Sequence, residues 1–312
     1  MKRIYYICNL QAGKAEIGSH LGTVLDMMTK AGYEVTVHPT QSPLDATYSA
    51  AAAADSGLYD LIFCSGGDGT LNEVLCGMFR AKNDLPIGYI PCGSVNDFAR
   101  SIGIPREIPR ACAAALDGYP RRFDIGMAND RCFNYIAAFG AFTDVTYETP
   151  QAAKNVLGPA AYILNAMTKI NSIQAFPMRI TCDGTVIEDE FAFGMVTNSA
   201  SVGGVLDISD FCFDDGTFEI TLLKRPMNPS ELHRTLSFLR DIHEIRDDDM
   251  IYCLRASEVT IELADGVNMP WTVDGEYLQN ARIMRIVNHK RAVQLLVPED
   301  GPTHCYETSQ KE

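Results

Sequence analysis

Three glycine-bearing loops contain residue types that bind phosphate. SGGDGTLNE (65–73) and PCGSVNDFAR (91–100) each follow an apolar run, and NLQAGK (9–14) follows the first apolar run of the chain. Glycine lets backbone amides approach an anion, and a helix that begins after the loop adds the positive end of its dipole. The negative charge of Asp68 beside a polyphosphate becomes favourable when a divalent cation lies between them. These loops therefore indicate a nucleotide site.

Structural interpretations of the same residues stay open at this point. Asp68 could contact amides of its own turn, and Asn96 and Asp97 could cap the helix that follows them. The Asp-Gly pairs at 215–216 and 274–275 are typical of hairpin turns. The residues alone therefore do not separate a catalytic role from a structural one.

The first 125 residues alternate between strand-like and helix-like segments. Segments rich in β-branched and aromatic residues lie at 3–9, 33–39, 59–65 and 86–92. Helical patterns lie between them at 17–32, 43–57 and 71–82. Strand, helix, strand, helix predicts a parallel sheet covered by helices. Ligands bind at the carboxyl edge of such a sheet, which is where the glycine-bearing loops and Thr40 lie.

From about residue 122 the pattern changes to strands joined by turns. Two hairpins are predicted, one with its turn at Asn129-Asp130 and one with its turn at Asp183-Gly184. Helical patterns are found at 152–173 and 229–242. Further strand-like segments lie at 218–225, 258–263, 271–278, 282–288 and 291–300. The second half is therefore predicted to be mostly antiparallel β-structure.

Composition limits the classes of protein and partner. At 312 residues with 46% hydrophobic and 21% charged residues, the chain is expected to form two globular domains or one large α/β unit. A net charge of −14 argues against a nucleic-acid partner. No stretch reaches the roughly 18–20 apolar residues that cross a bilayer. The ten cysteines form no C-x-x-C pair, so we expect reduced, buried thiols in a cytoplasmic protein.

The loop sequences resemble a known family. GGDGTLNE (66–73) and PCGSVNDFAR (91–100) closely match the two main signatures of the diacylglycerol kinase catalytic domain of soluble bacterial lipid kinases. TNSASVGGVLDI (197–208), FDDGTFEI (213–220) and VDGE (273–276) match its second-domain motifs in the expected order. The resemblance covers nearly the whole chain, and five motifs in order make coincidence an insufficient explanation.

The resemblance implies a fold and a division into domains. An α/β domain related to those of NAD kinases and diacylglycerol kinases is expected at 1–124, and a mostly antiparallel β-sandwich at 125–288. The segment 289–312 is expected to return to the first domain. The active site is then expected in the cleft between the domains.

The resemblance also implies roles for individual residues. The general base is expected to be Glu276 of D-G-E, with Asp68 as a second catalytic residue. The residues expected to bind nucleotide are Asn9, Gly13, Lys14, Thr40, Gly66, Gly67, Asp68, Gly69, Thr70, Asn72, Ser94, Asn96 and Asp97.

A magnesium site and a supporting network are implied beside these residues. The metal is expected at the carboxylate of Asp215, with backbone carbonyls near Cys212 and Thr217. Arg100 and Asp124 form the supporting group. Asp124 could join a network with Asp68 or have a structural role between the domains, and Lys14 and Arg100 could contact phosphate or face solvent.

NLQAGK (9–14) resembles the family's N-P-x-S-G-x motif at Asn9 and Gly13 but departs from it between them. Leu10 replaces the usual proline and Ala12 replaces the usual serine, which could remove one phosphate contact. Ser94 replaces the commoner threonine and keeps the hydroxyl. The cluster Gly203-Gly204-Val205 is one glycine short of the frequent run. Asp68, Asp215 and Glu276 are all present, so activity is expected.

The sequence thus predicts an ATP- and Mg²⁺-dependent lipid kinase. It would phosphorylate the hydroxyl of diacylglycerol or a related lipid, giving phosphatidic acid or an analogue, during transient peripheral contact with the inner face of the membrane. Exposed edge strands could support a homodimer. One alternative is an NAD kinase-like enzyme, which PCGSVNDFAR disfavours. The other is a catalytically silent lipid- or nucleotide-binding regulator, which the presence of Glu276 disfavours.

Overall fold

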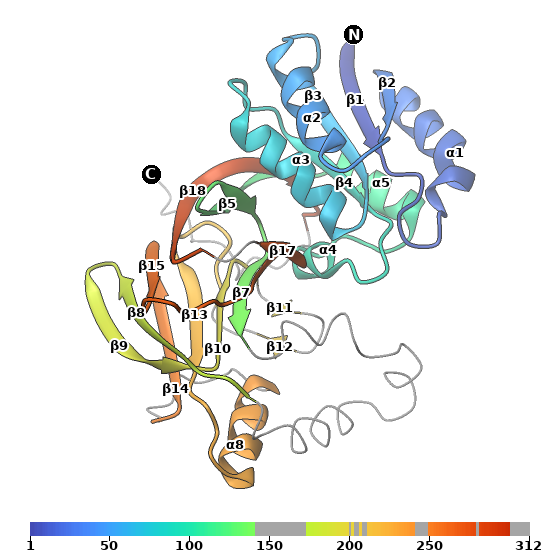
Figure 1. The fold of residues 1–312 in the computed structure, drawn as a ribbon. Helices are drawn as coiled ribbons and strands as arrows, with labels where there is room; N and C mark the ends of the chain where they lie inside the picture. Colours follow the sequence, from blue (N-terminus) through green and yellow to red (C-terminus); the bar gives the residue numbers. More distant parts are fainter. Residues whose placement is uncertain are drawn as a thin grey trace, which may run out of the picture.

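A large sheet runs through the whole described molecule. The computed structural model describes residues 1–140, 173–199, 201–202, 206–207, 211–240, 249–278 and 281–299. The ten strands of this sheet follow the order β2-β1-β3-β4-β18-β15-β8-β9, with β5 paired to β18 and β6 paired to β5 (Figure 1). The four strands at one end of this order belong to the N-terminal region, and the strands at the other end belong to the C-terminal half.

The N-terminal region is an α/β unit. Its parallel strands are β1 (Lys2–Cys8), β2 (Tyr33–Pro39), β3 (Leu61–Gly66) and β4 (Ile87–Pro91). Its helices are α1 (Ile17–Lys30), α2 (Asp45–Asp55), α3 (Asp68–Arg80), α4 (Asp97–Ser101) and α5 (Ile108–Leu116). Helix α2 packs against α3, and α1 against α5 (Figure 1). The prediction of a parallel sheet flanked by helices is confirmed.

The C-terminal half contains a second, antiparallel sheet in the order β14-β13-β10-β7-β16-β17. Its strands are β7 (Ile136–Gly140), β10 (Phe193–Thr197), β13 (Phe218–Leu223), β14 (Ile251–Ala256), β16 (Trp271–Val273) and β17 (Glu276–Leu278). It faces the antiparallel part of the large sheet, formed by β8 (Phe176–Cys182), β9 (Thr185–Phe191), β15 (Glu258–Leu263) and β18 (Ile283–Val297). The predicted antiparallel β-sandwich is confirmed.

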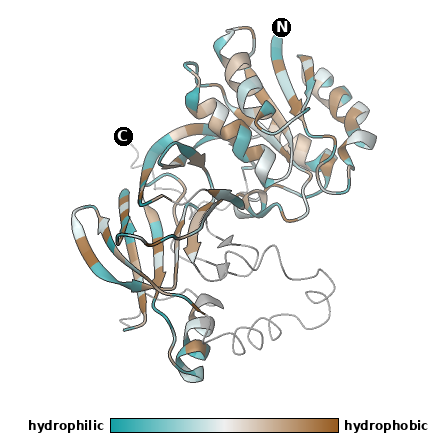
Figure 2. Ribbon diagram, in the orientation of Figure 1, coloured by the Kyte–Doolittle hydropathy of each residue, from teal (hydrophilic) through white to brown (hydrophobic). Residues whose placement is uncertain are grey.

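The core between the two sheets consists of large apolar side chains. Trp271, Phe139 and Phe191 are almost completely buried in one cluster with residues of both sheets. A separate cluster fills the N-terminal unit. Figure 2 shows helices with both hydrophobic and hydrophilic residues, as expected for elements with one buried and one exposed face. Helix α8 (Pro229–Arg240) lies on the C-terminal half, as its helical pattern predicted (Figure 1).

Strands β5 (Tyr119–Ala128) and β18 connect the two halves. The two strands pair along their length, and Leu295 near the end of β18 also pairs in parallel with Ile87 of β4. The register shifts between His289 and Val293, which bends the long strand. The C-terminal part of the chain therefore adds a strand to the N-terminal sheet. The boundaries at 124 and 288 fall inside these strands and stay predictions.

Several local predictions differ from the structure. Helix α3 begins at Asp68 rather than at residue 71, because Gly67 is the extended N-cap and a carboxylate suits the first turn of a helix. Helix α5 was not predicted, although Pro109 is a typical residue at a helix start. The strand expected after the predicted turn at Asn129-Asp130 is divided into β6 (Arg131–Phe133) and β7, which belong to different sheets. The predicted helix at 152–173 lies outside the described residues, apart from its last residue.

Candidate active site

The three glycine-bearing loops meet at the carboxyl edge of the parallel sheet. Gly13 has a φ of +56°, and a side chain there would overlap the carbonyl oxygen of Cys92. A Cβ on Gly93 would lie 2.6 Å from the Cα of Gly67. Backbone therefore packs directly on backbone where the loops cross, which only glycine permits.

Asn9 fastens the first loop to the start of α3. Its Nδ2 donates to Oγ1 of Thr70 over 3.1 Å, and its Oδ1 accepts the amide of Gln11 over 3.0 Å. Gly66 lies against Thr70, where a Cβ on the glycine would overlap the threonine side chain. Asn9, Gly66 and Thr70 thus form one contact group between loops that are about 60 residues apart in sequence.

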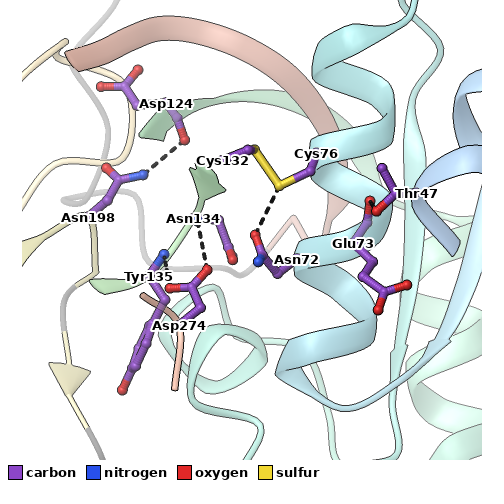
Figure 3. Close-up of a disulfide and its surroundings, with 10 residues drawn as sticks. All are labelled: Thr47, Asn72, Glu73, Cys76, Asp124, Cys132, Asn134, Tyr135, Asn198 and Asp274. Carbon is purple, nitrogen blue, oxygen red and sulfur yellow. Dashed lines mark hydrogen bonds between the residues drawn. A yellow bond between two sulfur atoms is a disulfide. The ribbon is translucent and has the colours of Figure 1, made fainter. Parts of the chain in front are cut away.

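Other predicted nucleotide residues lie around this group with different exposures. The side chains of Lys14 and Ser94 are exposed, and Gly69 is exposed with open space where a Cβ would be. Thr40 follows β2 and donates its amide to the carbonyl of Cys8 over 3.0 Å. Asn72 points from α3 toward Cys76, with its Oδ1 3.3 Å from the sulfur (Figure 3).

Asp68 joins the loop at 65–73 to the loop at 91–100. Its carboxylate accepts the amide of Asn96 over 3.0 Å and the amide of Phe98 over 3.3 Å. Burial raises the pKa of Asp68, with a smaller contribution from the charge of Asp97, while the amide bonds oppose the shift. A lysine at this position could not accept either bond, so the carboxylate has a structural function in addition to any role with a cation.

Asn96 holds the third loop in shape. It adopts a left-handed conformation with a φ of +57°. Its Oδ1 accepts the amide of Gly93 and its Nδ2 donates to the carbonyl of Gly93, both over 2.8 Å. The side chain of Asn96 therefore binds the backbone of its own loop and makes no capping hydrogen bond to the helix that follows, so the capping interpretation is wrong for Asn96.

Asp97 is buried and receives donors from both halves of the molecule. Its Oδ1 accepts Nη2 of Arg100 over 2.7 Å, and its Oδ2 accepts the hydroxyl of Tyr135 over 2.8 Å. Arg100 thus lies with Asp97, as expected of a supporting residue. Tyr135 was not identified from the sequence, because it lies in a predicted strand and in none of the matched motifs.

The two acids of the D-G-E segment, Asp274 and Glu276, differ in their surroundings. The carboxylate of Asp274 accepts the amides of Asn134, Tyr135 and Ile136 over 3.1, 3.2 and 2.8 Å (Figure 3). Burial raises the pKa of Asp274 to about 7, although these three bonds lower it. Glu276 is exposed and forms an ion pair with Arg131 of β6. Sequence reasoning treated Asp274 as a turn residue, although it belongs to the motif that contains Glu276.

Asp124 lies at the junction of β5, β18 and the D-D-G segment (214–216). Its carboxylate accepts the amides of Gly216 and Arg291, each over 2.7 Å. Burial raises the pKa of Asp124 to about 6. These contacts correspond to the structural alternative stated for Asp124, because they connect segments far apart in the chain.

The predicted metal residues lie together beside Asp124. Asp215 Oδ1 accepts the amide and the hydroxyl of Thr217 over 2.8 and 2.9 Å. The carbonyl of Thr217 accepts Nδ2 of Asn288 over 3.1 Å, and Cys212 is partly buried three residues before Asp215. Carboxylate and carbonyl oxygens are donors that Mg²⁺ prefers, so the chemistry of this group fits the ion. Within the described ranges, no three His, Cys, Asp or Glu side chains form a metal-binding group.

A disulfide corrects the prediction that all cysteines are reduced. Cys76 of α3 and Cys132 of β6 are bonded, with their Cα atoms 5.8 Å apart (Figure 3). Seven other cysteines of the described chain are free. A separation of 56 residues gives no signal in the sequence, because only the packing of α3 on β6 brings the two together. The bond links the helix that begins at Asp68 to the segment whose amides hold Asp274.

Comparisons with known proteins agree with this arrangement. Residues 3–128 match the diacylglycerol kinase catalytic domain, and residues 139–296 match the YegS C-terminal NAD kinase beta sandwich-like domain. A diacylglycerol kinase from Bacillus subtilis is 35% identical over 302 residues, which cover 96% of this chain and 98% of the relative. One from Staphylococcus epidermidis is 32% identical, covering 96% and 93% of the two chains.

Solved structures agree with the fold. One from Bacillus anthracis has a TM-score of 0.81 at 25% identity, covering 96% of this chain and 98% of its own. A diacylglycerol kinase structure from the same organism has a TM-score of 0.74 at 23% identity, covering 96% and 97%, and is evidence for the fold alone.

These findings define the class as a two-domain lipid kinase. The chain belongs to the diacylglycerol kinase family. The resemblance inferred from the five motifs is therefore confirmed. None of the helices in the described ranges is long and apolar enough to span a bilayer.

Proposed function

We propose that this lipid kinase transfers the γ-phosphoryl group of ATP to the hydroxyl of diacylglycerol or a closely related lipid. The product would be phosphatidic acid or its analogue. The observation that carries the proposal is the meeting of the three glycine-bearing loops beside Asp68 and Asp97, with the D-G-E segment of the second domain joined to them through Tyr135. The similarity to diacylglycerol kinases of Bacillus subtilis and Staphylococcus epidermidis supports the choice of lipid.

The loops supply the residues expected to hold the nucleotide. The exposed side chains of Lys14 and Ser94 and the open space at Gly69 face away from the packed core. Thr70 is held by Asn9 at the start of α3, where the helix dipole favours an anion. Mg²⁺ bound with ATP would supply charge neutralisation at the phosphates, and Asp68 is the carboxylate that would hold it, directly or through water.

Ala12 and Leu10 of the first loop remain compatible with this site. Ala12 is buried, so its methyl group fills space within the loop. Leu10 is 38% exposed and places no polar group near Asn9. Phosphate binding here rests on backbone amides and on the neighbouring loops, which retain their glycines.

We assign the general base to Glu276. A carboxylate at the edge of the cleft can accept the proton of the lipid hydroxyl as it attacks phosphorus. Glu276 is exposed and paired with Arg131, so the acceptor lipid must displace this ion pair. Asp274 uses both carboxylate oxygens to bind three amides and is assigned the role of anchoring the turn.

The second acidic group is assigned to magnesium. Asp215, with carbonyl oxygens of its own segment, would hold the ion next to Asp124. The carboxylates of Asp124 and Asp215 both accept hydrogen bonds from residues 216–217. An ion there would stabilise the junction of the domains rather than take part in phosphoryl transfer.

The site of action follows from the substrate class. The lipid acceptor would be met at the cytoplasmic face of a membrane through peripheral contact, since no described helix spans a bilayer. The sheets end in edge strands at β2, β9, β14 and β17, which offer hydrogen-bonding groups to a second copy of the chain. A homodimer is therefore part of the proposal.

The decisive experiment measures phosphoryl transfer from radiolabelled ATP to a panel of lipids in mixed micelles. Diacylglycerol, monoacylglycerol, phosphatidylglycerol and ceramide are compared, with NAD as a separate acceptor. Labelled phosphatidic acid is expected from diacylglycerol. Phosphorylation of NAD without any labelled lipid would overturn the proposal, and so would the absence of transfer to every acceptor.

The base is tested by substitution. Glu276→Gln should lower kcat by about 10²–10⁴-fold, the range typical of general-base loss. The matched control is Glu262→Gln, because Glu262 is an exposed glutamate on β15 outside the site. Asp274→Asn separates the neighbouring acid. An unchanged kcat in Glu276→Gln would show that Glu276 is not the general base.

A further inference from the structure

Tyr135 lies where the chain passes from one sheet of the second domain to the other. Strand β6 ends at Phe133 and pairs with β5 in the large sheet, whereas β7 begins at Ile136 in the second sheet. Residues 134 and 135 make this transition. The side chain of Tyr135 is partly buried, and its hydroxyl reaches the nucleotide-binding loop.

Three hydrogen bonds fix this residue. Its hydroxyl donates to Oδ2 of Asp97 over 2.8 Å, its amide donates to Oδ1 of Asp274 over 3.2 Å, and its carbonyl accepts the amide of Asn198 over 2.9 Å. The backbone contacts lie in the second domain, and the hydroxyl contact lies in the first. One residue thus connects the loop that contains Asp97 with the motif that contains Glu276.

The hydroxyl acts on a side chain whose position affects the rest of the site. Only 3% of the surface of Asp97 is exposed, and its second carboxylate oxygen, Oδ1, accepts a hydrogen bond from Arg100. The amides of Asn96 and Phe98, on either side of Asp97, bind Asp68. A hydrogen bond to a charged oxygen is stronger and more directional than one between neutral groups. Loss of the hydroxyl would therefore leave one oxygen of Asp97 without its donor and the loop less constrained.

We propose that Tyr135 is a positioning residue for phosphoryl transfer: its hydroxyl orients Asp97 when the second domain is seated on the nucleotide-binding loops. The inference rests on the proposed kinase function. If Tyr135 has this role, the placement of Asp97 depends on the position of residues 134–136, whose amides also bind Asp274. The hydroxyl of Tyr135 then couples the placement of the catalytic groups from the two domains, in addition to the disulfide between Cys76 and Cys132.

A simple packing role for the tyrosine predicts a different result. If the ring only filled space between the domains, removal of the hydroxyl would change stability and leave turnover intact. If the hydroxyl orients Asp97, its removal should lower kcat more than it raises KM for ATP, because the loss affects the transition state more than nucleotide binding. The two roles are therefore separable by kinetics.

The test variant is Tyr135→Phe. Phenylalanine keeps the ring and the two backbone contacts and removes the hydroxyl that donates to Asp97. We expect kcat for diacylglycerol phosphorylation to fall about tenfold or more, with KM for ATP changed less than threefold. The matched control is Tyr252→Phe, which removes a tyrosine hydroxyl that also contacts an aspartate, Asp189, over 3.4 Å on the far side of the second domain. The control should retain wild-type kcat.

A second measurement is independent of lipid phosphorylation. Hydrogen exchange of the peptide covering 93–98 should be faster in Tyr135→Phe than in the wild type and unchanged in the control, with thermal unfolding recorded for all three proteins. An active wild type with equal kcat and equal exchange in Tyr135→Phe would overturn the inference about Tyr135. A wild type without lipid kinase activity would overturn the proposed function instead, and the exchange rates would then decide alone whether Tyr135 orders the loop.

Discussion

The disulfide between Cys76 and Cys132 should contribute strongly to stability. It joins α3 of the first domain to β6 of the second and closes a loop with a sequence separation of 56. In the chain-entropy model, a loop of this length lowers the entropy of the unfolded chain by about 14 cal/mol/K, equivalent to about 4 kcal/mol at 25 °C. Replacing both cysteines with serine should lower the free energy of unfolding by up to about this amount.

Urea unfolding followed by fluorescence of the single tryptophan measures this change. Trp271 is almost completely buried in the core of the sandwich, so its emission reports unfolding of the second domain. Wild type and the double variant Cys76→Ser/Cys132→Ser are compared with and without reductant. Reductant should destabilise the wild type and leave the double variant unchanged, because the other cysteines of the described chain are free thiols.

The chemistry of the bond is checked in parallel. Alkylation of the unfolded wild type should label two fewer thiols before reduction than after it, and the double variant should show no difference. Equal labelling of the wild type in both states would show that the bond is absent. A bond that is present but changes the unfolding free energy by less than about 0.5 kcal/mol would refute the entropic reasoning.

Three further predictions concern single residues. Gly13→Ala should destabilise the fold by more than about 1 kcal/mol in thermal unfolding, because its left-handed φ of +56° disfavours a side chain and Cys92 leaves no room; an unchanged melting temperature would contradict this. Asp124→Ala should cost about 2–5 kcal/mol in urea unfolding, because two buried amides lose their acceptor, whereas Asp124→Asn should cost less. Burial raises the pKa of Glu219 to about 8, so the native state holds this proton more tightly than the unfolded state and stability should fall as pH rises from about 4.5 to 8. Glu219→Gln should make the unfolding free energy less dependent on pH over that range. A pH profile identical to that of the wild type would show that the pKa of Glu219 is not raised.

The meeting of the glycine-bearing loops was predictable because the information that specifies each loop is local. GGDGT and PCGSVNDFAR each combine a strand end, glycines and a helix start within about ten residues, and parallel-sheet topology places such strand ends at one edge. The alternation of strands and helices therefore indicated both the fold of the first domain and the loops that meet in it. The start of α3 at Asp68 was missed because Gly67 can serve as an N-cap or as a loop residue, and its surroundings decide.

The contacts between the halves could not be read from the sequence in the same way. Asp97 and Tyr135 are 38 residues apart, Asp124 and Arg291 are 167 apart, and the disulfide spans 56. Each pair depends on how β6, β7 and β18 cross between the sheets, which no local pattern specifies.

By itself, the sequence determined the three glycine-bearing loops, the parallel sheet that places them and the family to which the chain belongs. Tertiary structure decided which donors each acid meets, because a carboxylate's partners depend on backbone groups brought close only by folding. Asp68, Asp97, Asp124 and Asp274 are chemically alike in sequence. They differ in function because each carboxylate meets a different set of donors once the sheets are assembled.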